Sequence, residues 1–192
     1  SQEAKAKEFF PKSKLKSDFY QFIKIQLSLV IFLVSISYYL IKFGAGVEFL
    51  DSYKLVGPIA LSLFFSSLSA YAGVDYLKTK KTKKLFYSTL KGGLANILFA
   101  LVLVNFFGLY GIVFSSMIGF LLTFYLRLKD SPNLKSLFKM FEKKLYIGIL
   151  VMSLIYIVQL FGSPPVIITT FIIVFIGLLY WNKRIILNKI IK

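Results

Sequence analysis

One lysine and three amide side chains are the groups in this sequence that could do chemistry, because they lie inside long apolar stretches. Lys91 and Asn96 stand in one such stretch, Asn105 follows further along it, and Gln159 stands in a later one. In a predicted helix Lys91 is about 10 Å below the membrane surface at ~1.5 Å per residue. An ionisable group at membrane depth marks a binding or transport site by default.

Two roles stay open for Lys91 from the sequence. Its amino group could face a cavity inside the protein, or its four-carbon stem could carry the charge back to the lipid headgroups. For Asn96, Asn105 and Gln159 we expect hydrogen bonds between neighbouring helices.

Several kinds of catalytic chemistry have no candidate residues here. The chain has no cysteine and no histidine, so thiolate and imidazole ligands or catalysts are absent. Carboxylates are sparse, and Glu48, Asp51 and Asp75 are the candidates near a membrane face. No paired carboxylates, glycine-rich phosphate loop or serine nucleophile motif occurs. The sequence therefore predicts a protein that moves or binds something, not an enzyme, with no cofactor and no metal site.

The length of the apolar stretches predicts helices that cross a membrane. Residues 92–126 contain no charge, and as one helix they would be roughly 52 Å long, whereas the hydrocarbon layer is ~30 Å thick. The chain must therefore turn, and the glycines of Phe107-Gly108-Leu109-Tyr110-Gly111 permit a tight reversal. Residues 145–182 are also free of charge and too long, and Gly162-Ser163-Pro164-Pro165 breaks them.

These breaks predict an all-α membrane protein with six transmembrane helices. The expected spans are residues 22–43, 55–77, 85–106, 110–126, 146–161 and 166–181. Five regions follow: a basic cytoplasmic lead-in (1–20), a four-helix region (21–128), a cytoplasmic amphipathic linker helix on the membrane surface (129–144), two further spans (145–182) and a basic cytoplasmic tail (183–192).

The distribution of charge predicts that both ends lie in the cytoplasm. The net charge is +16, but the lysines lie between the apolar stretches and not on a soluble basic face, so nucleic acid is not an expected partner. With a cytoplasmic N-terminus, 20 of the 24 Lys and Arg residues fall in cytoplasmic segments, as the positive-inside rule requires.

Small residues recur at helical spacing in three of the predicted spans. They are Gly111, Ser115 and Gly119; Gly92, Asn96 and Ala100; and Ser62, Ser66, Ser69 and Gly73. Such faces let helices approach closely. For the set in the second span, a polar lining of a water-filled cavity is the alternative to packing.

The order of features over about residues 22–126 resembles a known family. A serine-rich span and a short Lys-Thr-Lys loop precede GGLANILFALVLV, which contains Asn96. A Gly-x-x-Gly turn, Gly108 to Gly111, then opens a helix with Ser115, Ser116 and Gly119. This pattern is similar to the C-terminal part of polysaccharide biosynthesis proteins, the O-antigen and capsule flippases of the multidrug/oligosaccharidyl-lipid/polysaccharide exporter superfamily.

The resemblance implies a transporter of two lobes with 12–14 helices, of which this chain is the C-terminal portion and about eight spans precede Ser1. It implies a polyprenyl-diphosphate-linked oligosaccharide as substrate, carried across the cytoplasmic membrane of a prokaryote by alternating access. Membrane lipids and a polysaccharide polymerase or assembly protein are the implied partners. Lys91 would offset the diphosphate charge, with Asn96 as a second substrate-binding residue.

Three other functions stay open. A cation-coupled multidrug exporter of the same superfamily needs a carboxylate inside the membrane, and none lies deeper here than Asp75. A non-transporting six-span subunit for cell-envelope assembly would also explain why no catalytic motif occurs. A membrane-embedded glycosyltransferase or polymerase needs acidic or histidine residues near a membrane face, where this chain has too few to form a site.

Overall fold

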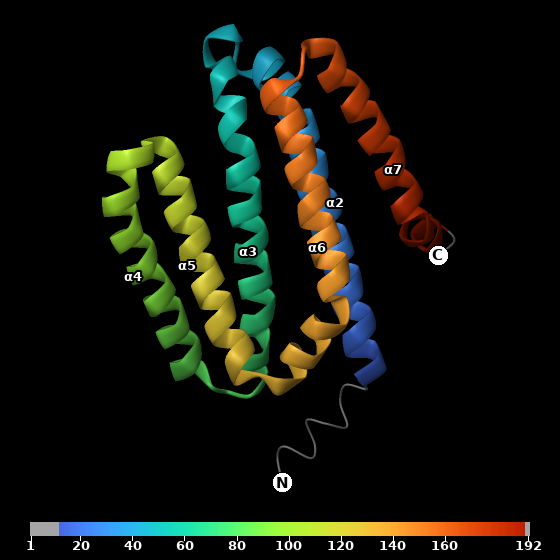
Figure 1. The fold of residues 1–192 in the computed structure, drawn as a ribbon. Coiled ribbons are helices and arrows are strands. Elements are labelled where there is room, and N and C mark those ends of the chain that lie inside the picture. Colours follow the sequence, from blue (N-terminus) through green and yellow to red (C-terminus); the bar gives the residue numbers. More distant parts are fainter. Residues whose placement is uncertain (1–11, 191–192) are drawn as a thin grey trace.

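Six long helices account for most of residues 12–190, the part of the chain that the computed structural model describes (Figure 1). All six are long and apolar enough to span a membrane, and residues 12–190 contain no strand. The prediction of an all-α, six-span membrane protein is thereby confirmed. Residues 1–11 of the predicted lead-in and 191–192 of the tail lie outside the described part. The helices are α2 (Lys12–Gly44), α3 (Tyr53–Lys78), α4 (Thr82–Phe107), α5 (Leu109–Asp130), α6 (Pro132–Phe161) and α7 (Pro164–Ile190), with a 3-10 helix η1 (Val47–Ser52) between α2 and α3.

The helices turn where the sequence predicted. α4 ends at Phe107 and α5 begins at Leu109, so Gly108 alone connects them, with φ 55° and ψ −130°. This backbone conformation favours glycine because it has no Cβ. The second predicted break also forms, since α6 ends at Phe161 and α7 begins at Pro164.

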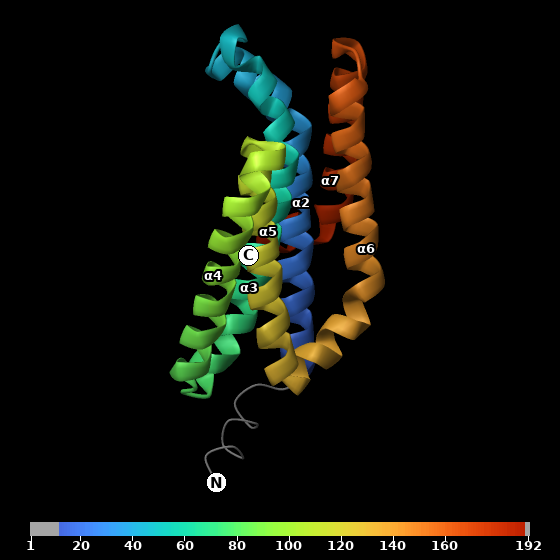
Figure 2. The same ribbon diagram turned by 60° about the vertical axis from the view of Figure 1, so that its left-hand side comes forward.

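The helices form a central group flanked on two sides. α2, α3 and α6 pack together, the α4–α5 hairpin lies against α3, and α7 lies beside α2 (Figures 1 and 2). One end of the bundle holds the α3–α4 connection, residues 79–81, and the α5–α6 connection at Ser131. We call it the basic end, because Lys80, Lys81 and Lys84 lie there, and we call the opposite end the far end.

The predicted linker helix (129–144) is not a separate helix, because α6 runs without a break from Pro132 to Phe161. Its first turns lie at an angle to the rest (Figure 2). Leu137 and Phe141 are buried in the core, where the Phe141 ring lies 5.7 Å from that of Phe19. The apolar face that predicted a surface helix therefore packs against α2.

Hydrogen bonds join the central helices near the far end. Gln159 of α6 is 2% exposed, and its Nε2 donates to the Val34 carbonyl of α2. Ser37 Oγ donates to Gln159 Oε1 at 3.4 Å, and the Tyr53 hydroxyl of α3 donates to the Gln159 carbonyl at 3.0 Å. The prediction that Gln159 bonds between helices is confirmed.

The α4–α5 hairpin is held together by glycines that let the two backbones approach. A Cβ on Gly92 would lie 1.8 Å from Thr123 Oγ1 and 2.7 Å from the Gly119 carbonyl oxygen, and one on Gly111 would lie 2.2 Å from the Leu103 carbonyl oxygen. The predicted small-residue faces of these two spans therefore meet.

Gly92→Ala tests this packing, with the neighbouring Gly93→Ala as its control. The added methyl at residue 92 meets Thr123 and backbone, so we expect the free energy of unfolding to fall by about 1–3 kcal/mol. A Cβ on Gly93 has nothing within 4 Å, and alanine favours helix by up to ~1 kcal/mol, so this change should be neutral or stabilising. Unfolding in mixed micelles measures both; equal losses would contradict the packing.

Single cysteines test the arrangement of the spans, because the chain has no cysteine of its own. Lys81→Cys and Lys135→Cys lie at the basic end, and Glu48→Cys and Ser163→Cys at the far end, all at exposed positions. We expect a membrane-impermeant maleimide to label the first pair from one side of the membrane and the second pair only from the other. Labelling of all four from one side would contradict six spans.

Candidate functional site

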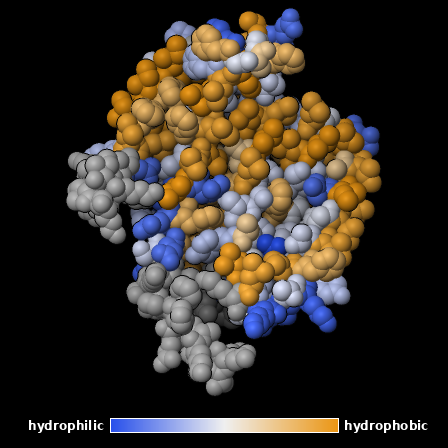
Figure 3. Space-filling model, turned by 180° about the vertical axis from the view of Figure 1, so that it is seen from behind, coloured by the Kyte–Doolittle hydropathy of each residue, from blue (hydrophilic) through white to orange (hydrophobic). Residues whose placement is uncertain are grey.

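A half-open cavity of about 240 Å³ lies between α3, α4 and α5 in the half of the bundle nearer the basic end. Small residues shape it, because Gly92, Gly93 and Gly119 form part of its wall. Hydrophilic side chains are also concentrated in the lower part of the rear face, whereas apolar side chains cover most of its upper part (Figure 3). The polar residues that line the cavity include Ser66, Ser69, Thr89, Asn96, Ser116 and Arg127.

Arg127 provides the only charge among the residues that line this cavity. Its side chain is 7% exposed and reaches from α5 to both neighbouring helices. Nη1 donates to the Ser69 carbonyl at 2.6 Å and to Ser69 Oγ at 3.2 Å on α3. On α4, Nε donates to Ser88 Oγ at 3.1 Å and Nη2 to Thr89 Oγ1 at 2.7 Å.

The acceptors around the guanidinium are all neutral. The two ion pairs among residues 12–190 join Lys54 to Asp51 and Lys84 to Asp130, so neither includes Arg127. A buried charge without a partner of opposite charge is costly in a medium of low dielectric constant. The arrangement therefore favours an anion near Arg127.

The backbone of α3 makes room for the guanidinium at Gly73. A Cβ on Gly73 would lie 2.9 Å from Arg127 Nη1. Together with Ser66 and Ser69, Gly73 was predicted to form one small face of its span, for packing or for lining a cavity. The structure shows both uses, since Ser66 and Ser69 line the cavity and Gly73 packs against Arg127.

The direction of α5 determines where the Arg127 side chain extends. Helical side chains tilt toward the N-terminus of their own helix, and α5 runs from the far end to the basic end. Arg127, three residues before the end of α5 at Asp130, therefore extends from the basic end toward the middle of the bundle. Its charge is held inside the protein, among α3, α4 and α5.

Asn96 lines the same cavity, and it lies about two helical turns further from the basic end than Thr89 does. Its Oδ1 accepts hydrogen bonds from Ser115 Oγ at 2.9 Å and Ser116 Oγ at 3.4 Å, both on α5. The predicted bond between helices is therefore present. The prediction for Asn105 is wrong in this respect, because Asn105 is exposed and its Nδ2 donates to Leu101 O in its own helix at 2.9 Å.

Lys91 is not among the residues that line the cavity, and its side chain is exposed on α4. Thr89, Gly92, Gly93 and Asn96 turn one face of α4 to the cavity, and Lys91 lies roughly 150° around the helix from the centre of that face at ~100° per residue. Its predicted role in substrate binding stays a prediction.

Arg127 was not predicted as a site residue, because it was counted with the cytoplasmic positive charges. Arg127 follows directly after the charge-free residues 92–126, so its charge placed it at the membrane surface and not inside the membrane. One signal was present, since 22 of the 24 basic residues are lysine and only Arg127 and Arg184 are arginine. A planar guanidinium can donate to several acceptors at once, as this site requires.

Comparison of the chain with protein-family models, curated proteins and solved structures gives no match. The fold itself defines the class: this is a multi-pass α-helical membrane protein with six spans.

Two asparagines on α4 give a matched test of the cavity wall. Asn96→Leu removes the acceptor of two bonds from α5, and we expect it to cost about 0.6–1.7 kcal/mol of unfolding free energy. Asn105→Leu removes only a bond within α4 from an exposed position, so its stability should stay equal or rise in detergent unfolding. A larger loss for Asn105→Leu would contradict the placement of these helices.

Proposed function

We propose that this chain is part of a flippase that moves a polyprenyl-diphosphate-linked oligosaccharide across a membrane by alternating access. The observation that carries the proposal is Arg127, a buried cation with neutral acceptors that lines a cavity among spanning helices. The resemblance of residues 22–126 to oligosaccharide-lipid flippases supplies the substrate class.

The chemistry of the guanidinium fits a diphosphate. Arginine and phosphate form charge-assisted hydrogen bonds, often two in parallel, that are about twice as strong as neutral ones. In the structure the Thr89 and Ser69 hydroxyls accept from Nη2 and Nη1. Phosphate oxygens would replace these hydroxyls as acceptors, and the substrate would bring the negative charge that the site lacks.

The position of the cavity also fits a lipid-linked substrate. Arg127 lies near the basic end of α5, at the level where the diphosphate of a lipid in that leaflet would lie. Asn96 lies deeper, about 10 Å along α4 from Thr89, where its amide can bond sugar hydroxyls. By this proposal the basic end is cytoplasmic, the membrane is the cytoplasmic membrane of a prokaryote, and a second lobe and polysaccharide assembly proteins are partners.

Binding of a short polyprenyl diphosphate tests the proposal. The purified chain is titrated with geranylgeranyl diphosphate and with geranylgeraniol, which has the same tail without charge. We expect the diphosphate to bind at least about tenfold more tightly, because a desolvated charge pair contributes on the order of 1.4 kcal/mol or more. Arg127→Ala should remove this preference and Arg127→Lys should retain part of it.

Two further variants separate binding from folding. Gly73→Ala keeps the arginine but displaces Nη1, so it should weaken diphosphate binding with little change in unfolding. Lys54→Ala removes an exposed charge at the far end that pairs with Asp51, and it should leave binding unchanged. Equal affinity for the diphosphate and the alcohol, or full binding by a folded Arg127→Ala variant, would refute the proposal and favour a non-transporting subunit.

A further inference from the structure

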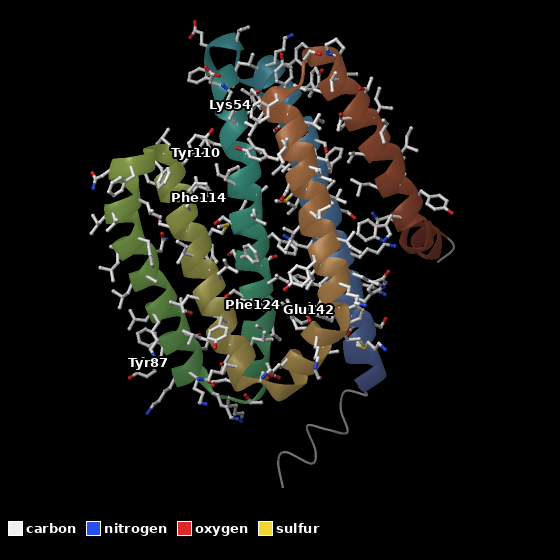
Figure 4. The ribbon with its side chains drawn as sticks, viewed as in Figure 1. Lys54, Tyr87, Tyr110, Phe114, Phe124 and Glu142 are labelled. Atoms are coloured by element: carbon white, nitrogen blue, oxygen red, sulfur yellow. The ribbon has the colours of Figure 1, made fainter. Side chains whose placement is uncertain are left out.

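A second cation lies on the opposite side of α4 from the cavity and has no place in the proposed transport site. Lys91 is exposed there among side chains that are apolar and equally uncovered, with Leu90 43%, Leu94 51% and Leu98 64% exposed. Tyr87 lies one turn closer to the basic end on the outer side of α4 and is 57% exposed (Figure 4). A lysine and a tyrosine thus share a face with three exposed leucines.

The direction of α4 sends the Lys91 amino group toward the basic end. α4 starts at the basic end, and helical side chains tilt toward the start of their helix. Lys91 therefore extends back along Tyr87 toward the headgroup level. Arg127, on the oppositely directed α5, extends into the bundle instead. The side chains of Lys91 and Arg127 thus extend in opposite directions along the bundle, because α4 and α5 are antiparallel.

Neither of the two ion pairs among the described side chains, Lys54 with Asp51 and Lys84 with Asp130, includes Lys91. The neighbours of Lys91 on this face are Tyr87 and the leucines, and none of them carries a negative charge. An amphiphile with an acyl tail along the leucines and an anionic headgroup at the amino group fits both the apolar surface and the positive charge.

We propose that Lys91 and Tyr87 bind the phosphate headgroup of an anionic phospholipid in the leaflet at the basic end. The Lys91 ammonium pairs with the phosphate, the Tyr87 ring and hydroxyl lie at the interface as aromatic anchors do, and the acyl chains cover Leu94 and Leu98. This inference is independent of the proposed transport function.

A lipid bound at Lys91 would set how deep the α4–α5 hairpin lies in the membrane. The charge-free part of α4, from Gly92 to Phe107, is about 24 Å long at ~1.5 Å per residue, less than the ~30 Å of hydrocarbon. The tip carries exposed Phe106, Phe107 and Leu109, and it lies below the far ends of α3 and α6 in Figure 1. With Lys91 at the headgroup level of the basic end, the apolar tip of the hairpin lies about 24 Å further along α4.

Electron spin resonance of lipids around the reconstituted chain tests the inference. Spin-labelled phosphatidylglycerol and phosphatidylcholine are compared for their relative association with the protein. One lysine near an anionic surface contributes about a fivefold preference, so Lys91→Ala should lower the association of phosphatidylglycerol at this site by about that factor. Lys91→Arg should retain the preference, and Tyr87→Leu should lower it less.

Lys81→Ala is the matched control, because Lys81 is exposed at the same end but precedes the apolar part of α4. An equal fall for Lys81→Ala, or an unchanged preference for Lys91→Ala, overturns the inference. So does a Lys91→Ala variant that keeps its lipid preference but loses affinity for geranylgeranyl diphosphate, which would assign Lys91 to the substrate. Leu98→Cys should stay monomeric under oxidation; disulfide-linked dimers would show that a second copy covers this face.

Discussion

The candidate site depends on the close approach of α4 and α5. Gly92 and Gly119 bring the two backbones so near that a Cβ on Gly92 would lie 2.7 Å from the Gly119 carbonyl oxygen. Only at this separation can short hydroxyl and amide side chains bond across the pair, as Ser115 does to Asn96. The same approach brings Ser88 and Thr89 within reach of the Arg127 guanidinium. A wider hairpin would lose both the wall of the cavity and the acceptors that hold its charge.

Packing of this kind matters more in a bilayer than in water. Lipid tails are as apolar as leucine, so burying leucine between helices gains little from the hydrophobic effect, and shape and hydrogen bonds decide which helices associate. The polar contacts are accordingly placed at helix junctions. Gln159 joins α6 to α2 and α3 near the far end, and Asn96 and Arg127 join α3, α4 and α5 in the basic half.

Much of the fold could be predicted from the sequence, because the thickness of a membrane limits the length of a span. The breaks at Gly108 and Gly162 followed from stretches too long for one crossing. Asn96 and Gln159 were recognised because amides at that depth need partners. The continuous α6 was not predicted, since an apolar face on a charged helix fits a membrane surface and a protein neighbour equally well. Its neighbour Phe19 is distant in sequence.

The site was harder to predict because the role of a cation depends on the face and the direction of its helix. For Lys91 both a cavity and the headgroups were open, and it lies on the outer face of α4; Arg127 was counted with the cytoplasmic charges, yet it is 7% exposed. Depth along a helix can be counted from the sequence, whereas the face that meets a neighbour is fixed only when the helices pack.

The two ends of the bundle are held differently, and this bears on the alternating access that we propose. At the far end the Tyr156 hydroxyl donates to the Lys54 carbonyl at 2.6 Å, and a Cβ on Gly57 would lie 2.3 Å from the Tyr156 ring, so α6 and α3 are in tight contact. In the basic half α3, α4 and α5 line a small cavity and are joined by the hydrogen bonds of Arg127. The far-end ties are neutral hydrogen bonds, each of which contributes on average only about 0.6 kcal/mol in a membrane protein. In the proposed transport function, the binding energy of a single charge pair at Arg127, on the order of 1.4 kcal/mol or more, would exceed the contribution of any one of these bonds.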